Sequence, residues 1–154
     1  MQSTLDRKKN NAKRNEGPYS PKSSSVQNPA PEGRVLRVLV ADDHQIFRHA
    51  LVKLLGSQPD FLVVGQASDG VEAIELANRL RPEIIIMDIS MPNMNGIDAT
   101  GQIHAEMPDL RIIGLSMHDS SAMVQGFMAA GGDAYINKTV LTDNLFNAIR
   151  GVSP

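Results

Sequence analysis

Three acidic residues follow or close two short apolar runs of the sequence. Asp42 and Asp43 come directly after residues 35–41, and Asp88 closes residues 84–88. Runs this short and apolar are typical of strands buried on both faces, where an ionised carboxylate is costly unless something uses its charge. Clustered carboxylates suit a hard divalent cation such as Mg²⁺, and a carboxylate can also be the nucleophile in phosphoryl transfer. We therefore expect Asp42 and Asp43 to hold a metal ion and Asp88 to attack phosphorus.

Two further polar residues close later apolar runs. Ser116 ends residues 110–116, and Lys138 comes just after residues 134–136. A transferred phosphoryl group must be held in line with its nucleophile, and its oxygens must be neutralised by cations and hydrogen-bond donors. We expect Ser116 and Lys138 to bind those oxygens.

Each of these residues also has an ordinary structural interpretation. Asp42 alone would fit a helix N-cap, Ser116 a satisfied strand-end hydroxyl, and Lys138 an exposed lysine. Tyr135 alone would be a core residue. The functional hypothesis thus depends on the set. The histidines have neither metal-ligand spacing nor a partner serine, and we interpret all four as structural or exposed: His44, His49, His104 and His118.

The elements that must position this set alternate along the chain. Strands are predicted at residues 35–41, 61–64, 84–88, 110–116 and 134–136, and helices follow each of them. The predicted helix caps are Ser68 to Gly70, Asn95, Asp119 or Ser120, and Thr142. Residues at helical spacing predict the buried helix faces: Ile46, Phe47, Ala50, Leu51, Leu54 and Leu55; Ala73, Ile74, Ala77 and Leu80; Ile97 and Ile103; Met123, Val124, Phe127 and Met128; Leu145, Phe146 and Ile149.

Strict alternation of five strands with five helices predicts an α/β fold, with a parallel sheet covered on both faces. In such sheets a ligand site lies beyond the carboxyl ends of the strands, at the point where the strand order reverses. The acids, the hydroxyl and the lysine should therefore meet at one edge of the sheet.

Composition narrows the function classes. The chain has 154 residues and no cysteine, which excludes disulfides, thiolate zinc sites and thiol catalysis. No apolar run approaches the roughly 18 residues of a membrane span, and there is no signal peptide, so a cytoplasmic protein is expected. Residues 1–34 carry seven Lys/Arg against three Asp/Glu and are predicted to be a disordered basic tail. The remainder is acidic, which disfavours binding to nucleic-acid phosphates.

Four segments together resemble the receiver domain of two-component response regulators (CheY-like), over about residues 35–151. They are VLVADDH (38–44), IMDISMPNMNG (86–96), IIGLS (112–116) and AAGGDAYINK (129–138). The first and last are most similar to the NarL/FixJ-type subclass. The resemblance implies a doubly wound (βα)5 flavodoxin-like three-layer sandwich, with strand order 2-1-3-4-5.

The resemblance also implies a function in bacterial phosphorelay signalling. Asp88 would accept a phosphoryl group from a histidine kinase or a histidine phosphotransfer protein. Mg²⁺, or Mn²⁺ in its place, would lie on Asp42, Asp43, Asp88 and the backbone carbonyl of Ser90. No enzymatic activity is expected beyond autophosphorylation and autodephosphorylation at this site.

A conformational switch would follow phosphorylation. Ser116 would move toward the phosphoryl group and Tyr135 would turn inward behind it. This would reshape the face made by the fourth helix, fifth strand and fifth helix, where partners bind and a homodimer would form. Ser90 and His118, two residues beyond Asp88 and Ser116, resemble positions that tune the rate of dephosphorylation.

Other readings remain. A flavin-binding protein of this fold would need a Ser/Thr/Gly-rich loop where Asp42 and Asp43 stand. A haloacid-dehalogenase-type phosphatase would carry an acid at Ser90. A receiver that binds partners without being phosphorylated is the main alternative. No helix-turn-helix follows residue 151, so no DNA-binding domain is expected in this chain. The chain is a stand-alone receiver or part of a larger regulator or hybrid kinase, and its start at Met1 favours the former.

Overall fold

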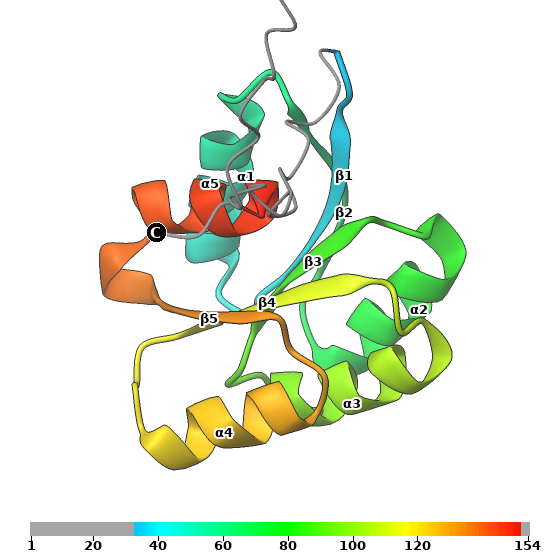
Figure 1. Cartoon of the computed structure of the whole chain (residues 1–154), viewed down its shortest axis with the longest axis vertical. Helices are drawn as coiled ribbons and strands as arrows, with labels where there is room; N and C mark the ends of the chain where they lie inside the picture. Colours follow the sequence, from blue (N-terminus) through cyan, green and yellow to red (C-terminus); the bar gives the residue numbers. More distant parts are fainter. Residues whose placement is uncertain (1–32, 152–154) are drawn as a thin grey trace, which may run out of the picture.

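The fold is an alternating series of strands and helices, seen here in a computed structural model that describes residues 33–151 (Figure 1). Most of the predicted basic tail, residues 1–32, lies outside the described residues. The elements in chain order are β1 (Leu36–Ala41), α1 (Gln45–Gly56), β2 (Phe61–Ala67), α2 (Gly70–Leu80), β3 (Ile84–Asp88), α3 (Gly96–Glu106), β4 (Arg111–Ser116), α4 (Ser121–Ala129), β5 (Ala134–Asn137), the short 3₁₀ helix η1 (Lys138–Val140) and α5 (Thr142–Arg150).

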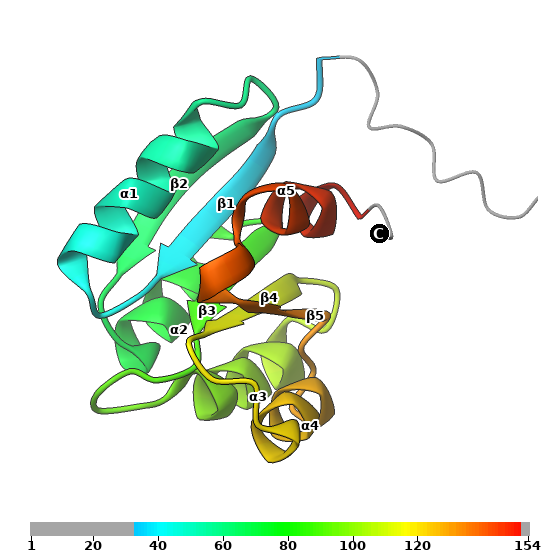
Figure 2. The same cartoon turned by 90° about the vertical axis from the view of Figure 1, so that its left-hand side faces the viewer.

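All five strands are parallel, and their order in the sheet is β2-β1-β3-β4-β5. Helices α1 and α5 cover one face of the sheet, and α2, α3 and α4 cover the other (Figures 1 and 2). The predicted α/β three-layer sandwich and its strand order are confirmed. None of the described helices is long and apolar enough to cross a membrane.

Two hydrophobic cores lie on the two faces of the sheet, because successive strand residues point to opposite sides. In β1, Val38 and Val40 face α1 and α5, whereas Leu39 and Ala41 face the other three helices. Every residue of β3 is buried, as expected for a strand covered on both faces. Helix residues fully buried in the two cores are Leu55, Leu145 and Ile149 on one side, and Ala73, Ala77, Ala99, Ile103 and Phe127 on the other.

Helix starts are set largely by side-chain caps. Asp69, Asn95 and Ser120 each accept a hydrogen bond from the backbone N–H three residues later, as predicted for these caps. The cap predicted at Thr142 is wrong. Leu141 takes the N-cap position with helical backbone angles, and Thr142 is already the first helical residue. The 3₁₀ helix η1 runs almost directly into α5, so the chain arrives in helical conformation and leaves no extended residue to act as a cap.

The predicted buried faces of α1 and α4 are too wide. Ile46 is 89% exposed, and Ala50 and Met128 are also exposed. Helix α1 packs on β1 and β2, at one edge of the sheet. Only a narrow stripe of α1, carrying Leu51 and Leu55, is therefore fully covered.

The bend that follows β3 is closed by the start of α3. The Gly96 N–H donates to the Ile89 carbonyl at 2.9 Å, which brings the two backbones together. A Cβ at Gly96 would collide with the carbonyl oxygen of Asp88 and lie 3.0 Å from the Cα of Ile89. Glycine is therefore needed here for a close backbone approach.

Gly96→Ala should accordingly lower the free energy of unfolding by about 1–3 kcal/mol, because rigid backbone must shift to admit the methyl group. The matched control is Gly56→Ala, at a helical position with nothing within 4 Å of the new Cβ. That variant should be neutral or more stable by roughly 0.5 kcal/mol. Urea denaturation measures both, and equal stabilities of the two variants would contradict this account of Gly96.

Candidate functional site

The carboxyl ends of β1 and β3 bring the predicted acids together. The two strands are neighbours, with Ala41 opposite Met87, so Asp42 and Asp88 leave the sheet side by side. This is the place where the strand order reverses, because β2 lies beyond β1 and β4 beyond β3. Ligand atoms from four residues lie within 4.8 Å of one another there: Asp42, Asp43, His44 and Asp88.

Lys138 bridges two of these acids. Its side chain comes from the start of η1, just past β5, and is only 5% exposed. The Nζ atom lies 2.8 Å from Oδ2 of Asp42 and 3.2 Å from Oδ2 of Asp88. It also lies 4.4 Å from the centre of the Phe47 ring, a cation–π distance. A lysine from the far side of the sheet is thereby fixed against the acid cluster, as the sequence predicted.

The charge of Asp88 is poorly compensated. Its side chain is 2% exposed, and burial, followed by the negative charge of Asp42, raises the pKa of Asp88 to about 6. Lys138 and the hydrogen bond from the Ser90 N–H to Oδ1, at 3.1 Å, oppose this shift without cancelling it. A further cation would relieve the repulsion.

The cluster fits a hard divalent cation. Lys138 contacts the Oδ2 atoms of Asp42 and Asp88. Each Oδ1 atom accepts one backbone N–H, from His44 and Ser90 respectively, and keeps a second lone pair for a metal ion, as does the Asp43 carboxylate. Asp43 Oδ1 is buried and accepts no hydrogen bond from the described residues, and the nearby polar atom is Nδ1 of the exposed His44 side chain, at 3.1 Å. A buried carboxylate oxygen without a donor is costly, and a bound cation would remove that cost. Oxygen ligands in this number suit Mg²⁺.

Ser116 and Tyr135 are bonded to the loop beside the acids and not to the acids themselves. Ser116 ends β4 beside β3 and is buried, and its hydroxyl accepts a hydrogen bond from the His118 N–H at 3.1 Å. The Tyr135 hydroxyl donates to the His118 carbonyl at 2.6 Å. Within the described part of the chain, neither residue forms a hydrogen bond with Asp88 or Lys138. The two predicted switch residues are instead joined to each other through the backbone of His118.

The two predicted rate-tuning residues lie on loops at the edge of the site. Ser90 and His118 are both exposed, one after β3 and the other after β4. Each contacts the site through its backbone N–H, to Asp88 and to Ser116 respectively. Their tuning role stays a prediction.

Sequence reasoning missed two contacts of the site. His44 Nδ1 lies 3.1 Å from Oδ1 of Asp43 and 3.4 Å from Oδ1 of Asp42, a contact that the interpretation of His44 as structural or exposed does not include. Its position directly after the two acids was the available signal. The second contact joins Asn137 Nδ2 to Asp119 Oδ2 at 2.7 Å and ties the β4–α4 loop to the end of β5. No pattern in the sequence indicated that pair.

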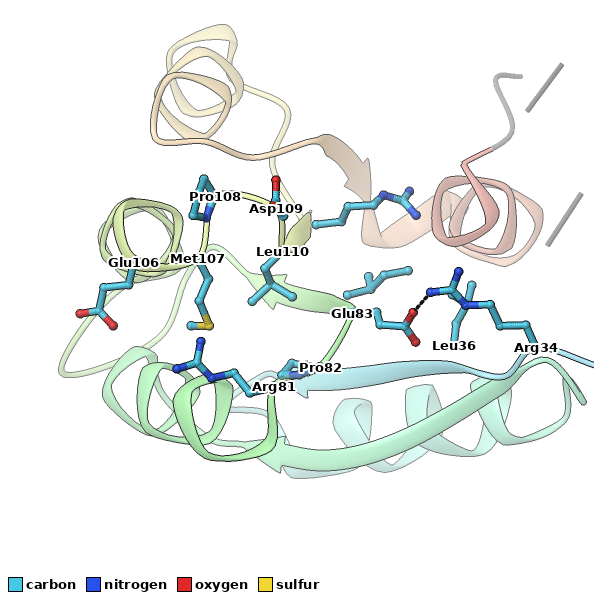
Figure 3. Close-up of a pocket in the computed structure, with 12 residues that line it drawn as sticks. Arg34, Leu36, Arg81, Pro82, Glu83, Glu106, Met107, Pro108, Asp109 and Leu110 are labelled. Carbon is cyan, nitrogen blue, oxygen red and sulfur yellow. Dashed lines mark hydrogen bonds and ion pairs between the residues drawn. The ribbon is translucent and has the colours of Figure 1, made fainter. Parts of the chain in front are cut away.

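A separate hollow lies at the opposite ends of the strands and includes none of the candidate residues (Figure 3). Its charged lining is largely paired: Arg34 donates to Glu83, and two nitrogens of Arg111 donate to carbonyls at the end of α5. Beside it, Arg37 donates to the carbonyls of Leu80 and Arg81 at the end of α2. Arg37 and Arg111 thus bind carbonyls at the C-terminal ends of α2 and α5, where intrahelical donors run out, which is a structural role.

Known proteins share the sequence pattern and the fold of this chain. Residues 38–150 match the family described as the response regulator receiver domain. The chain is 41% identical to the transcriptional regulatory protein LiaR of Bacillus subtilis over 119 residues, 77% of this chain and 56% of LiaR. Among solved structures, the response regulator domain of Thermotoga maritima CheB has a TM-score of 0.72 and 37% identity, and the match covers 79% of this chain and all of that one.

A second solved structure bears on the subclass. The receiver domain of the putative response regulator NarL from Mycobacterium tuberculosis has a TM-score of 0.71 and 28% identity, over 77% of this chain and 98% of that one. The chain spans about half the length of the curated relatives that it matches. The chain belongs to the response regulator receiver domain family of two-component systems, and its relatives include NarL-type regulators, as its motifs predicted.

Proposed function

We propose that this receiver accepts a phosphoryl group on Asp88 from a histidine kinase or a histidine phosphotransfer protein. The observation that carries the proposal is the bridge from Lys138 to Asp42 and Asp88, at the end of a fully buried strand. A buried lysine held between two buried acids is costly to build for stability alone, because both charges must be desolvated. The proposal gives each charge a use.

In the proposed step, one carboxylate oxygen of Asp88 attacks the phosphorus of the donor. A bond from Asp88 to phosphorus forms while the bond from phosphorus to the leaving group breaks, and the leaving group departs with the electron pair. Lys138 and the N–H groups of the loop after β3 would bind the phosphoryl oxygens in the course of this exchange. The product is an acyl phosphate at Asp88.

A divalent ion would be held by Asp42, Asp43, Asp88 and the Ser90 carbonyl. When bound, it would neutralise the charge that gathers on the phosphoryl oxygens. Mg²⁺ is the expected ion and Mn²⁺ an alternative, since both accept oxygen ligands. The unpartnered Asp43 oxygen supports this placement.

The output of the proposed site is a change at the α4–β5–α5 face. Ser116 would leave the His118 N–H for the phosphoryl group, which would loosen the loop that Tyr135 also holds. Tyr135 would then turn inward, and the face would bind a partner or a second copy of the chain. We assign this cytoplasmic receiver to residues 35–151. A receiver acting only as a scaffold would not need Lys138, Asp42, Asp43 and Asp88 in contact.

Phosphorylation is tested directly with acetyl phosphate and Mg²⁺. The wild type should gain the mass of one phosphoryl group, and the group should be released by hydroxylamine, as expected of an acyl phosphate. Asp88→Asn should gain none. Asp109→Asn, an exposed acid at the other end of the sheet, should behave as the wild type. No mass gain in the wild type, or an equal gain in Asp88→Asn, would contradict the assignment and favour the scaffold.

The pH dependence of stability is expected to reflect the buried charge. Because the pKa of Asp88 is about 6 in the folded protein and near 4 in an unfolded chain, the ionised carboxylate destabilises the fold above pH 6. In chelator, Asp88→Asn should therefore be more stable than the wild type at about pH 7, and the difference should shrink toward about pH 5 as Asp88 takes up a proton. Urea denaturation at both pH values measures this, and a constant difference would contradict it.

Beryllofluoride, which mimics a phosphoryl group, tests the switch. The chain has two tyrosines and no tryptophan, so Tyr19→Phe leaves Tyr135 as the only strong intrinsic fluorophore. Beryllofluoride with Mg²⁺ should reduce quenching of that fluorescence by iodide, and adding Asp88→Asn should abolish the effect. Sedimentation of the same samples tests the dimer separately. An unchanged oligomeric state would remove the dimer from the proposal, and unchanged quenching would remove the Tyr135 switch.

A further inference from the structure

His44 lies against the acid cluster without a structural task of its own. It takes the N-cap position of α1, but its side chain makes no capping hydrogen bond. The imidazole is 69% exposed, and its Nδ1 lies 3.1 Å from Asp43 Oδ1. An exposed side chain in this position is free to turn toward the acids or away from them.

We propose that His44 is a nitrogen ligand of the metal site and raises the affinity of the site for transition-metal ions relative to its affinity for Mg²⁺. The inference rests on the proposed metal site of the preceding section and deepens it. Without His44 the site offers oxygen ligands alone. With His44 it offers oxygens and one imidazole nitrogen.

Two carboxylate oxygens of the cluster have capacity left for a ligand. The Asp88 side chain is only 2% exposed. Among the described residues its Oδ2 atom has no hydrogen-bond partner, and its one contact is the ion pair with Lys138 at 3.2 Å. The buried Oδ1 atom of Asp43 accepts no hydrogen bond from the described residues, and the His44 Nδ1 atom lies 3.1 Å from it. Both carboxylates are directed into the same small volume as the imidazole, since one ligand atom from each residue lies within 4.8 Å of the others.

The geometry needs little change to close on one ion. Ligand atoms on opposite sides of a zinc-sized ion are about 4.4 Å apart at most, and the ligand atoms of the cluster all lie within 4.8 Å of one another. Asp42 and Asp88 are fixed by burial and by Lys138, so His44 would move. Its exposed side chain can do so without disturbing the core.

The chemistry predicts which ions respond. Imidazole is a good ligand for Zn²⁺, Ni²⁺ and Co²⁺, whereas Mg²⁺ prefers oxygen and keeps several waters. Losing His44 should therefore weaken binding of the transition metals and leave Mg²⁺ almost unaffected. If His44 acted only through charge, its loss would alter the affinities for all of these ions alike.

Calorimetric titration of the metal-free full chain, near neutral pH, tests the proposal with Mg²⁺, Co²⁺ and Ni²⁺. His44→Ala should lower the affinity for Co²⁺ and Ni²⁺ by about tenfold or more, and that for Mg²⁺ by less than about twofold. His49→Ala, an exposed histidine farther along α1, should change neither. Equal losses for Mg²⁺ and the transition metals, or no loss for any, would overturn the role of His44.

A second measurement does not depend on a variant that folds. Cu²⁺ bound to the wild type should show nitrogen coupling from a coordinated imidazole in pulsed electron paramagnetic resonance, because imidazole is a good ligand for Cu²⁺, and the absence of that coupling would overturn the proposal. Asp43→Asn separates the two levels of inference. If it leaves the affinities for all ions intact, the proposed metal site itself fails. If it weakens them while His44→Ala does not, only the role of His44 fails.

Discussion

The contact on which the site depends is the bridge from the Lys138 ammonium to Asp42 and Asp88. Three carboxylates crowd the ends of β1 and β3, and at least two of them are almost fully buried. Without a cation they would repel one another in a place where water cannot screen them. Lys138 supplies one positive charge from beyond β5, which is too little for three acids, and the raised pKa of Asp88 records the shortfall. The same shortfall makes the site receptive to a divalent ion, so the electrostatic strain and the proposed chemistry have one origin.

The parallel sheet lets the fold tolerate this concentration of charge. Its two hydrophobic cores hold β3 rigidly from both faces, and the strand order reverses where β1 and β3 end, so no crossover helix covers their carboxyl ends. The bend after Asp88 is fixed by the start of α3, because its first residue, Gly96, packs against the backbone of Asp88 and Ile89. Charged groups can therefore sit at the rim with defined positions, while the stability of the fold comes from apolar packing elsewhere.

The features that could be predicted from the sequence are those that depend on residues adjacent in the chain. The strand runs and the caps at Asp69, Asn95 and Ser120 are written in adjacent residues, and all three caps form. The predictions that Ile46 is buried and that Thr142 is a cap were wrong. The first depends on the edge of the sheet under α1, and the second on the 3₁₀ helix before α5, and neither can be inferred from adjacent residues. In the site, strand ends located the acids, Ser116 and Lys138. The contact of His44 with the acids was missed because spacing rules look for repeated ligands, and a single histidine beside two aspartates has none.

The site residues divide into an inner and an outer group, and this division bears on how a modified Asp88 could alter the surface. The inner group, made of Asp42, Asp88 and Lys138, is fixed by burial and ion pairs. The outer group is held only by hydrogen bonds at the β4–α4 loop: the Ser116 hydroxyl to the His118 N–H, the Tyr135 hydroxyl to the His118 carbonyl, and Asn137 to Asp119. Ser116 links the two groups, since it is buried at the end of β4, beside β3, and its hydroxyl is bonded to the loop. A new charge at Asp88 that draws the Ser116 hydroxyl inward would remove one of these bonds. The remaining two hydrogen bonds are themselves exposed, so water competes with them. The β4–α4 loop is therefore the part of the site that can rearrange at the lowest cost in free energy. It leads into α4 and is bonded to the end of β5.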